Sequence, residues 1–154
     1  MRSPGFYNGA VDAAVEARLR SFFEADARGA IAVYLFGSVA RGETRAESDV
    51  DLGILFSAEP PATLAAPQFA LEAELERVLH APVQIVTLNR APTDLVHRVL
   101  RDGHLLLDLD RRARIRFEVR SRNEYFDMAP IRGLYRRYPE PARSAVGTAA
   151  ERRR

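Results

Sequence analysis

The sequence predicts a small α/β (α+β) domain in which helices pack on a mixed sheet of about four strands. Short runs of strand-forming residues alternate with segments in which apolar residues recur at helical spacing. Gly and Pro separate many of these segments. A chain of 154 residues with 47% hydrophobic composition also has the length and apolar content of one compact domain.

The first half of the chain predicts one helix and two strands. Apolar residues at helical spacing predict a helix over residues 8–28, and Gly29 can end it. Residues 30–36 are rich in strand formers and predict a largely buried strand. A second strand follows over 49–56. Three prolines within 57–67 predict an irregular surface loop.

The next segments predict further alternation of helix and strand. Residues 68–80 place their leucines on one helical face, and residues 83–88 form a third strand. Thr93 can cap a short helix that Gly103 ends. The short apolar run at 105–107 predicts a fourth strand at the sheet edge.

The C-terminal part predicts a long helix followed by a tail. Residues 110–138 are mainly helical, with a kink or break near Pro130 and Gly133. We assign residues 1–138 to the domain and 139–154 to a disordered, Arg-rich tail. The aromatic residues between 125 and 138 either complete the core or form a protein interface.

Composition limits the chemistry and the cellular location. The absence of cysteine excludes a disulfide or a thiolate metal site, so a metal would have oxygen or imidazole ligands. No run approaches the roughly 20 apolar residues of a membrane span, and the N-terminus lacks the apolar core of a signal peptide. We therefore expect a cytoplasmic protein without membrane contact.

The basic residues are distributed unevenly. All 23 are Arg, and many lie beyond residue 110. Such a pattern can bind polyanions, but the complete replacement of Lys by Arg also fits simple composition bias. We favour composition bias and expect no specific nucleic acid partner.

The candidate site combines two short motifs. Gly37 permits close backbone approach after a strand, and Ser38 can open a short helix whose amides and hydroxyl meet phosphate oxygens. Asp49 and Asp51 are two residues apart on a predicted strand, so their carboxylates share a face and can hold Mg²⁺. Each motif alone is more often structural, whereas their combination indicates nucleotide and metal binding.

Two further residues are candidates for phosphate contact. Arg41 follows Ser38 by three residues and would lie on the same side of a helix. A solvated surface arginine explains Arg41 nearly as well. Ser48 precedes the acidic pair, where it could contact phosphate or fix the loop.

The sequence resembles the nucleotidyltransferase superfamily that includes DNA polymerase β, specifically its minimal bacterial members, the MNT proteins. The shared pattern is a Gly-Ser pair, ten intervening residues and then Asp-x-Asp. The similarity continues through residues 83–92, 97–103 and 125–127, and so covers roughly positions 30 to 135. It implies a nucleotidyltransferase-like fold.

The resemblance also implies a biological role. These stretches are similar to the antitoxins of HEPN/MNT toxin–antitoxin pairs, which transfer AMP from ATP to a tyrosine of the partner HEPN ribonuclease toxin. It therefore implies ATP as substrate, Mg²⁺ as cofactor and a HEPN-family toxin as partner. Homo- or hetero-oligomer formation stays open.

One position departs from the family pattern. The family usually places a third acidic residue on the strand that here carries Gln84. Because Gln has no charge and cannot take a proton at neutral pH, metal binding on the acceptor side should weaken. Nucleotide binding should be less affected than transfer.

Three functions therefore stay open. The first is AMP transfer by Asp49 and Asp51 to a HEPN partner. The second is a catalytically weakened antitoxin that neutralises its partner by binding alone. The third is nucleotidyl transfer to a small molecule or an RNA end, which the short chain disfavours because it lacks an added substrate domain.

Overall fold

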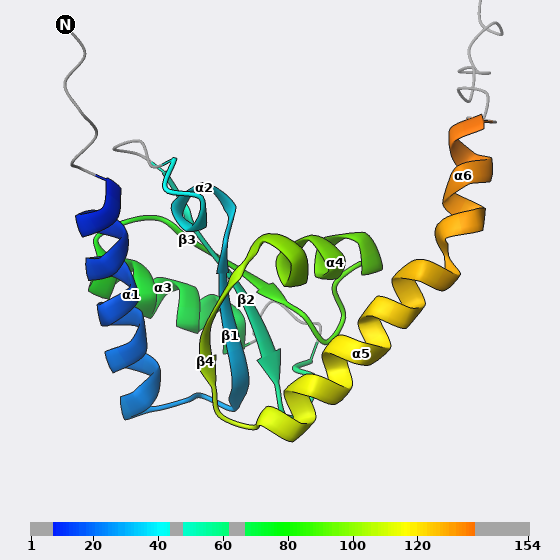
Figure 1. Ribbon diagram of the computed structural model, residues 1–154. Coiled ribbons are helices and arrows are strands. Elements are labelled where there is room, and N and C mark those ends of the chain that lie inside the picture. Colours follow the sequence, from blue (N-terminus) through cyan, green and yellow to red (C-terminus); the bar gives the residue numbers. More distant parts are fainter. Residues whose placement is uncertain (1–7, 44–47, 62–66, 138–154) are drawn as a thin grey trace, which may run out of the picture.

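The computed structural model describes residues 8–43, 48–61 and 67–137. It confirms the predicted alternation of helices and strands (Figure 1). The elements are α1 (Asn8–Ala25), β1 (Ala30–Phe36), α2 (Gly37–Ala40), β2 (Val50–Phe56), α3 (Pro67–Leu79), β3 (Val83–Thr87), α4 (Thr93–Asp102), β4 (His104–Asp108), α5 (Arg111–Asp127) and α6 (Ala129–Arg137).

The four strands form one mixed sheet in the order β3-β2-β1-β4. β1 pairs antiparallel with both β2 and β4, and β2 pairs parallel with β3. The strand predicted at 105–107 is indeed at an edge, as β4. The parallel register aligns Asp51 with Gln84, so two of the predicted site residues are neighbours on adjacent strands.

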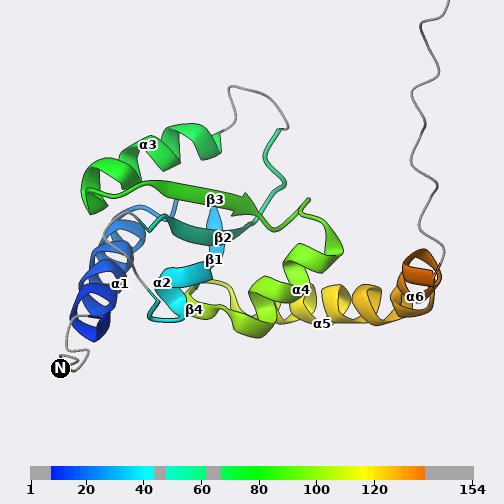
Figure 2. The same cartoon turned by 90° about the horizontal axis from the view of Figure 1, so that it is seen from above.

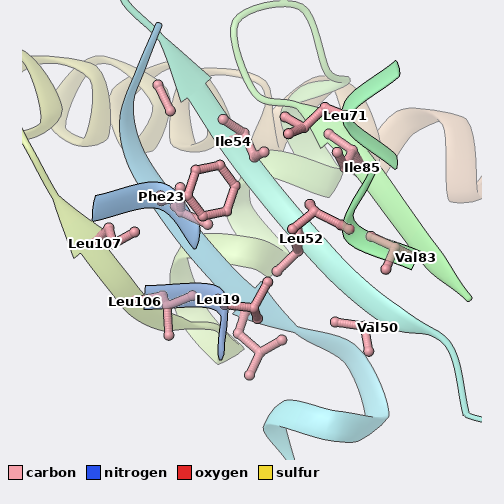
Figure 3. Packing of buried hydrophobic residues seen from close by; sticks show 14 of the residues in the cluster. Leu19, Phe23, Val50, Leu52, Ile54, Leu71, Val83, Ile85, Leu106 and Leu107 are labelled. Carbon is pink, nitrogen blue, oxygen red and sulfur yellow. The ribbon is translucent and has the colours of Figure 1, made fainter. Parts of the chain in front are cut away.

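Helices cover both faces of the sheet (Figure 2). On one face, side chains of α1 and α3 pack against alternate residues of β1, β2 and β3. Figure 3 shows this core, in which Leu19 and Phe23 of α1 lie over Leu52 and Ile54 of β2. The strand residues that alternate with these point to the other face of the sheet. There they pack against α4 and α5 in a second buried cluster.

Two glycines let α4 lie close to the sheet. A Cβ on Gly53 of β2 would lie 2.9 Å from Val99 Cγ1. A Cβ on Gly103 would lie 3.2 Å from the Leu35 carbonyl oxygen of β1 and 2.5 Å from the Val99 carbonyl oxygen of α4. Gly103 does end α4, as predicted, and close approach rather than a positive φ explains why glycine stands there. The cap prediction for Thr93 was wrong, because α4 begins at Thr93 and Pro92 occupies the cap position without a side-chain bond.

A buried polar group fixes α5 on the sheet. The Tyr34 hydroxyl donates to Glu118 Oε1 at 2.7 Å. Arg114 donates to the same oxygen at 2.6 Å and pairs with Asp108 of β4 at 2.9 Å. The start of α5 is capped by Asp110, whose side chain accepts from the Ala113 amide.

The long C-terminal helix breaks next to Pro130, as the sequence predicts, but not at Gly133. α5 ends at Asp127, with Met128 as its cap residue, and α6 begins at Ala129. Pro130 is tolerated because the first turn of a helix needs no amide donor, and Gly133 lies within α6 without interrupting it. The predicted tail over 139–154 lies outside the described residues.

α5 and α6 extend beyond the sheet (Figure 1). An aromatic contact braces this extension against α4. The Tyr125 ring stacks on His97, with centroids 3.6 Å apart, and Arg132 of α6 lies 3.8 Å from its centroid. In the described part of the chain, no helix is both long and apolar enough to cross a membrane.

Candidate active site

Gly37 forms the turn at the end of β1. Its φ of +73° lies in the left-handed region that favours glycine. A Cβ at this position would lie 2.1 Å from Asp51 Oδ2. The Asp51 carboxylate therefore packs directly against the Gly37 backbone, whereas the approach of a phosphate to Gly37 stays a prediction.

The two acidic residues lie at the start of β2. Asp51 is half-buried and pairs in register with Phe36, the last residue of β1. Asp49 is exposed and immediately precedes the strand. Burial raises the pKa of the Asp51 carboxyl, the negative charge of Asp49 raises it further, and the positive charge of Arg41 opposes both effects. The pair thus concentrates negative charge at one end of the sheet.

The remaining predicted residues lie around this pair. Ser38 is the second residue of α2, which begins at Gly37 and not at Ser38 as predicted, and its carbonyl oxygen accepts from the Glu43 amide at 3.0 Å. The Arg41 guanidinium bonds Glu43 at 3.1 Å and still acts electrostatically on Asp51. Ser48 is half-buried just before Asp49.

A cavity of about 340 Å³ opens beside the acidic pair. Its walls include four predicted residues, and five others complete it. The predicted residues are Gly37, Arg41, Asp51 and Gln84, and the others are Phe36, Val86, Leu95, Arg98 and Asp102. Ser38, Ser48 and Asp49 do not line this cavity.

Sequence reasoning missed the α4 wall. Leu95, Arg98 and Asp102 are separated by three and four residues, so they share one face of α4. That spacing was visible in the sequence. Which helix face would meet the acidic pair depended on strand order, which the sequence did not indicate.

The acidic pair fits a magnesium ion that is shared with a nucleotide. Among residues 8–43, 48–61 and 67–137, no group of three or more His, Cys, Asp or Glu side chains could hold a metal. Mg²⁺ commonly binds one or two carboxylates together with substrate phosphates and water. Asp49 and Asp51 match that donor set, and their mutual repulsion is relieved by a divalent cation.

Comparison with known families agrees with this geometry. A family model described as polymerase beta, nucleotidyltransferase matches residues 18–112. The chain belongs to this nucleotidyltransferase family. The matched range includes the Gly37 turn, both aspartates and the α4 wall of the nucleotidyltransferase.

Solved structures share the fold. A toxin–antitoxin solved with AMP-PNP has a TM-score of 0.68 and 23% identity, covering 79% of this chain and 95% of that chain. The MntA–HepT toxin–antitoxin has a TM-score of 0.64 and 21% identity, covering 81% and 96%. A structure from Shewanella oneidensis, a tri-AMPylated HEPN toxin in complex with an MNT antitoxin, has a TM-score of 0.65 and 21% identity, covering 82% and 96%.

No curated protein gives a significant match to this nucleotidyltransferase. The roles of Gly37, Ser38, Arg41, Ser48, Asp49 and Asp51 stay predictions.

Proposed function

We propose that the chain is a Mg²⁺-dependent adenylyltransferase that transfers AMP from ATP to a tyrosine of a HEPN-type ribonuclease toxin, and so acts as its antitoxin. One observation carries the proposal. In a chain of the nucleotidyltransferase family, the Asp51 carboxylate packs against a left-handed Gly37 backbone beside a cavity of about 340 Å³.

Each site residue has a proposed task. Asp49 and Asp51 hold the metal, while the backbone of Gly37 and Ser38 holds the triphosphate. Arg41 and Ser48 assist the phosphates. When bound, Mg²⁺ supplies positive charge that offsets the charge of the triphosphate. The missing Cβ of Gly37 leaves the space that lets phosphate and carboxylate approach the same ion.

Two observations favour a protein acceptor. Structures of similar fold include a toxin–antitoxin solved with AMP-PNP and a complex that contains a tri-AMPylated HEPN toxin. In addition, the end of α5 and α6 expose large apolar side chains. Phe126 is 62% exposed, Met128 44% and Ile131 42%. Of the two explanations for this aromatic segment, a protein interface suits these three residues better than a core does.

A label-transfer experiment tests the proposal. The purified chain, ATP labelled in its α-phosphate, Mg²⁺ and a purified HEPN-type ribonuclease as partner are incubated together. We expect label on a tyrosine of the partner, and we expect Asp49→Ala/Asp51→Ala to abolish it. Glu24→Ala removes an exposed carboxylate of α1 and should transfer normally. Absence of label with the wild-type chain would refute the enzymatic proposal.

A second function, neutralisation by contact alone, is favoured by Gln84. Gln84 pairs in register with Asp51, where a third carboxylate would complete the usual acidic set. Protection of cells that produce the toxin discriminates between the two functions. An antitoxin that acts by contact should protect equally well with Asp49→Ala/Asp51→Ala, whereas an enzyme should lose protection.

A further inference from the structure

The cavity beside Asp51 has a second wall that the proposed nucleotide contacts do not use. This wall, which we call the β3–α4 wall, consists of Gln84 and Val86 of β3 and Leu95, Arg98 and Asp102 of α4. It lines the same cavity as Gly37, Arg41 and Asp51, and its Gln84 lies beside Asp51 on the neighbouring strand. A group that attacks a nucleotide held at Gly37 and Asp51 could enter between the two walls.

The β3–α4 wall has no carboxylate suited to deprotonate an attacking hydroxyl. Gln84 is neutral. Asp102 accepts two hydrogen bonds of 2.7 Å from the Arg101 guanidinium. The Arg101 bond lowers the pKa of the Asp102 carboxyl, and the positive charges of Arg101, Arg41 and Arg98 lower it further. A carboxylate stabilised in this way is a weak base.

Arg98 gives the β3–α4 wall a cation instead of a carboxylate base. Its side chain is exposed at the cavity and makes no hydrogen bond or ion pair with any residue in the described ranges. A guanidinium stays charged at all ordinary pH values and offers several donors to an oxyanion. It can therefore stabilise a hydroxyl group in its ionised form without accepting a proton.

The consequence concerns which hydroxyl can react. A phenol, with a pKa of about 10, ionises far more readily than an aliphatic alcohol and needs less help from a base. The wall also offers apolar surface, because Val86 and Leu95 are half-buried beside Gln84 and Arg98. Apolar surface next to a cation suits a phenol ring whose oxygen is anionic.

We infer that the β3–α4 wall is the acceptor subsite, and that Arg98 binds and stabilises the phenolate oxygen of the acceptor where a third carboxylate would otherwise act as base. This inference rests on the proposed adenylyl transfer and assigns its acceptor side. The phenol loses its proton to water, and the phenolate oxygen forms a bond to the α-phosphorus of ATP. The bond from that phosphorus to the bridging oxygen breaks, and its electron pair leaves with pyrophosphate.

The test compares Arg98→Ala, Arg98→Lys and the control Arg77→Ala, which removes an exposed arginine from α3 on the other face of the sheet. The partner protein of the transfer assay is produced with tyrosine or with 3,5-difluorotyrosine, whose phenol is more acidic. Calorimetry with AMP-PNP and Mg²⁺ measures nucleotide binding separately from transfer.

We expect Arg98→Ala to bind AMP-PNP within about twofold of wild type and to transfer AMP about 100-fold more slowly, as for loss of one oxyanion donor. Its rate should reach a plateau at higher pH than that of wild type. Difluorotyrosine should restore much of the rate, and Arg98→Lys should be intermediate because it keeps the charge. Arg77→Ala should resemble wild type in every assay.

Three results would overturn the inference. If the wild-type chain labels its partner and Arg98→Ala does so at the same rate, Arg98 has no acceptor role, while the proposed function stands. Label found on serine or threonine by mass spectrometry would contradict the phenol preference. No transfer by the wild-type chain would remove the proposed function together with this inference.

Discussion

At the scale of single residues, Gly37 has two reasons to be glycine that can be separated by experiment. Its φ is +73°, and a Cβ would also collide with Asp51. Gly29 has a similar φ of +79°, but a Cβ there would meet nothing within 4 Å. The two glycines therefore form a matched pair.

We predict that Gly37→Ala weakens binding of AMP-PNP with Mg²⁺ by more than about tenfold, because the added Cβ would displace the Asp51 carboxylate. A loss of about 1.4 kcal/mol in binding free energy is enough for a tenfold change. Gly29→Ala should destabilise the fold by about 1–2 kcal/mol through its backbone conformation and leave affinity unchanged. Calorimetry and thermal unfolding measure the two effects. Equal affinity in Gly37→Ala and wild type would argue against phosphate binding at this turn.

Asp51 illustrates a conflict between function and stability. Burial and the charge of Asp49 raise the pKa of its carboxyl in the folded chain, so the folded state binds this proton more tightly than the unfolded state does. Ionised Asp51 therefore destabilises the fold at pH above its folded pKa. That penalty disappears as the pH falls through the folded pKa and the carboxyl becomes protonated.

We predict that Asp51→Asn raises the melting temperature of the metal-free chain at pH 7.5, and that the gain shrinks towards pH 4. Unfolding is followed by circular dichroism in the presence of a chelator. The control Asp127→Asn changes an exposed carboxylate at the end of α5 and should have little effect at either pH. A lower melting temperature for Asp51→Asn at pH 7.5 would contradict this explanation.

Some site residues could be predicted from the sequence and others could not. Gly37 and Asp51 belong to a motif whose spacing along the chain already indicates its chemistry, and the structure brings them into contact. Arg98 lies 47 residues after Asp51, and an arginine at that position is unremarkable in a chain whose 23 basic residues are all Arg. Only the packing of α4 on the sheet makes it part of the cavity.

At the scale of secondary-structure elements, α5 depends on polar contacts within a largely apolar layer. Tyr34 is only 3% exposed and donates to Glu118, which also accepts from Arg114. Loss of the tyrosine hydroxyl removes one hydrogen bond from a part-buried carboxylate that keeps its arginine partner.

We predict that Tyr34→Phe lowers the free energy of unfolding by about 1 kcal/mol, a usual value for one such bond. Urea denaturation measures the change. Arg120→Ala is the control, because its pair with Glu124 spans 3.7 Å between exposed side chains and should contribute little. If Tyr34→Phe is as stable as wild type, the polar group does not secure α5.

Element type and order could be predicted because apolar periodicity differs between strands and helices. The register that places Gln84 beside Asp51 could not, because it requires β2 and β3 to be parallel and adjacent. Local cap signals were less informative still. Thr93 does not cap α4, and Gly133 lies within α6 without a break, because tertiary packing outweighs these weak local preferences.

At the scale of the whole molecule, the proposed nucleotide site and the exposed apolar side chains lie on different parts of the fold. The end of the sheet at Gly37 and Asp51 carries the proposed nucleotide site, whereas α5 and α6 extend away from the sheet and expose apolar side chains (Figure 1). Stacking of His97 on Tyr125 connects α4, a wall of the cavity, to this extension. The proposed partner surface is thus connected through Tyr125 and His97 to the helix that carries Arg98.

Calorimetric titration of the purified chain with AMP-PNP, with and without Mg²⁺, tests the central claim most directly. The Gly37 turn and the two aspartates should give binding of one nucleotide per chain that requires Mg²⁺ and is lost in Asp49→Ala/Asp51→Ala but kept in Asp127→Ala. Binding of equal strength without Mg²⁺ or in the double variant, or no binding by the wild-type chain, would contradict the assignment of this site.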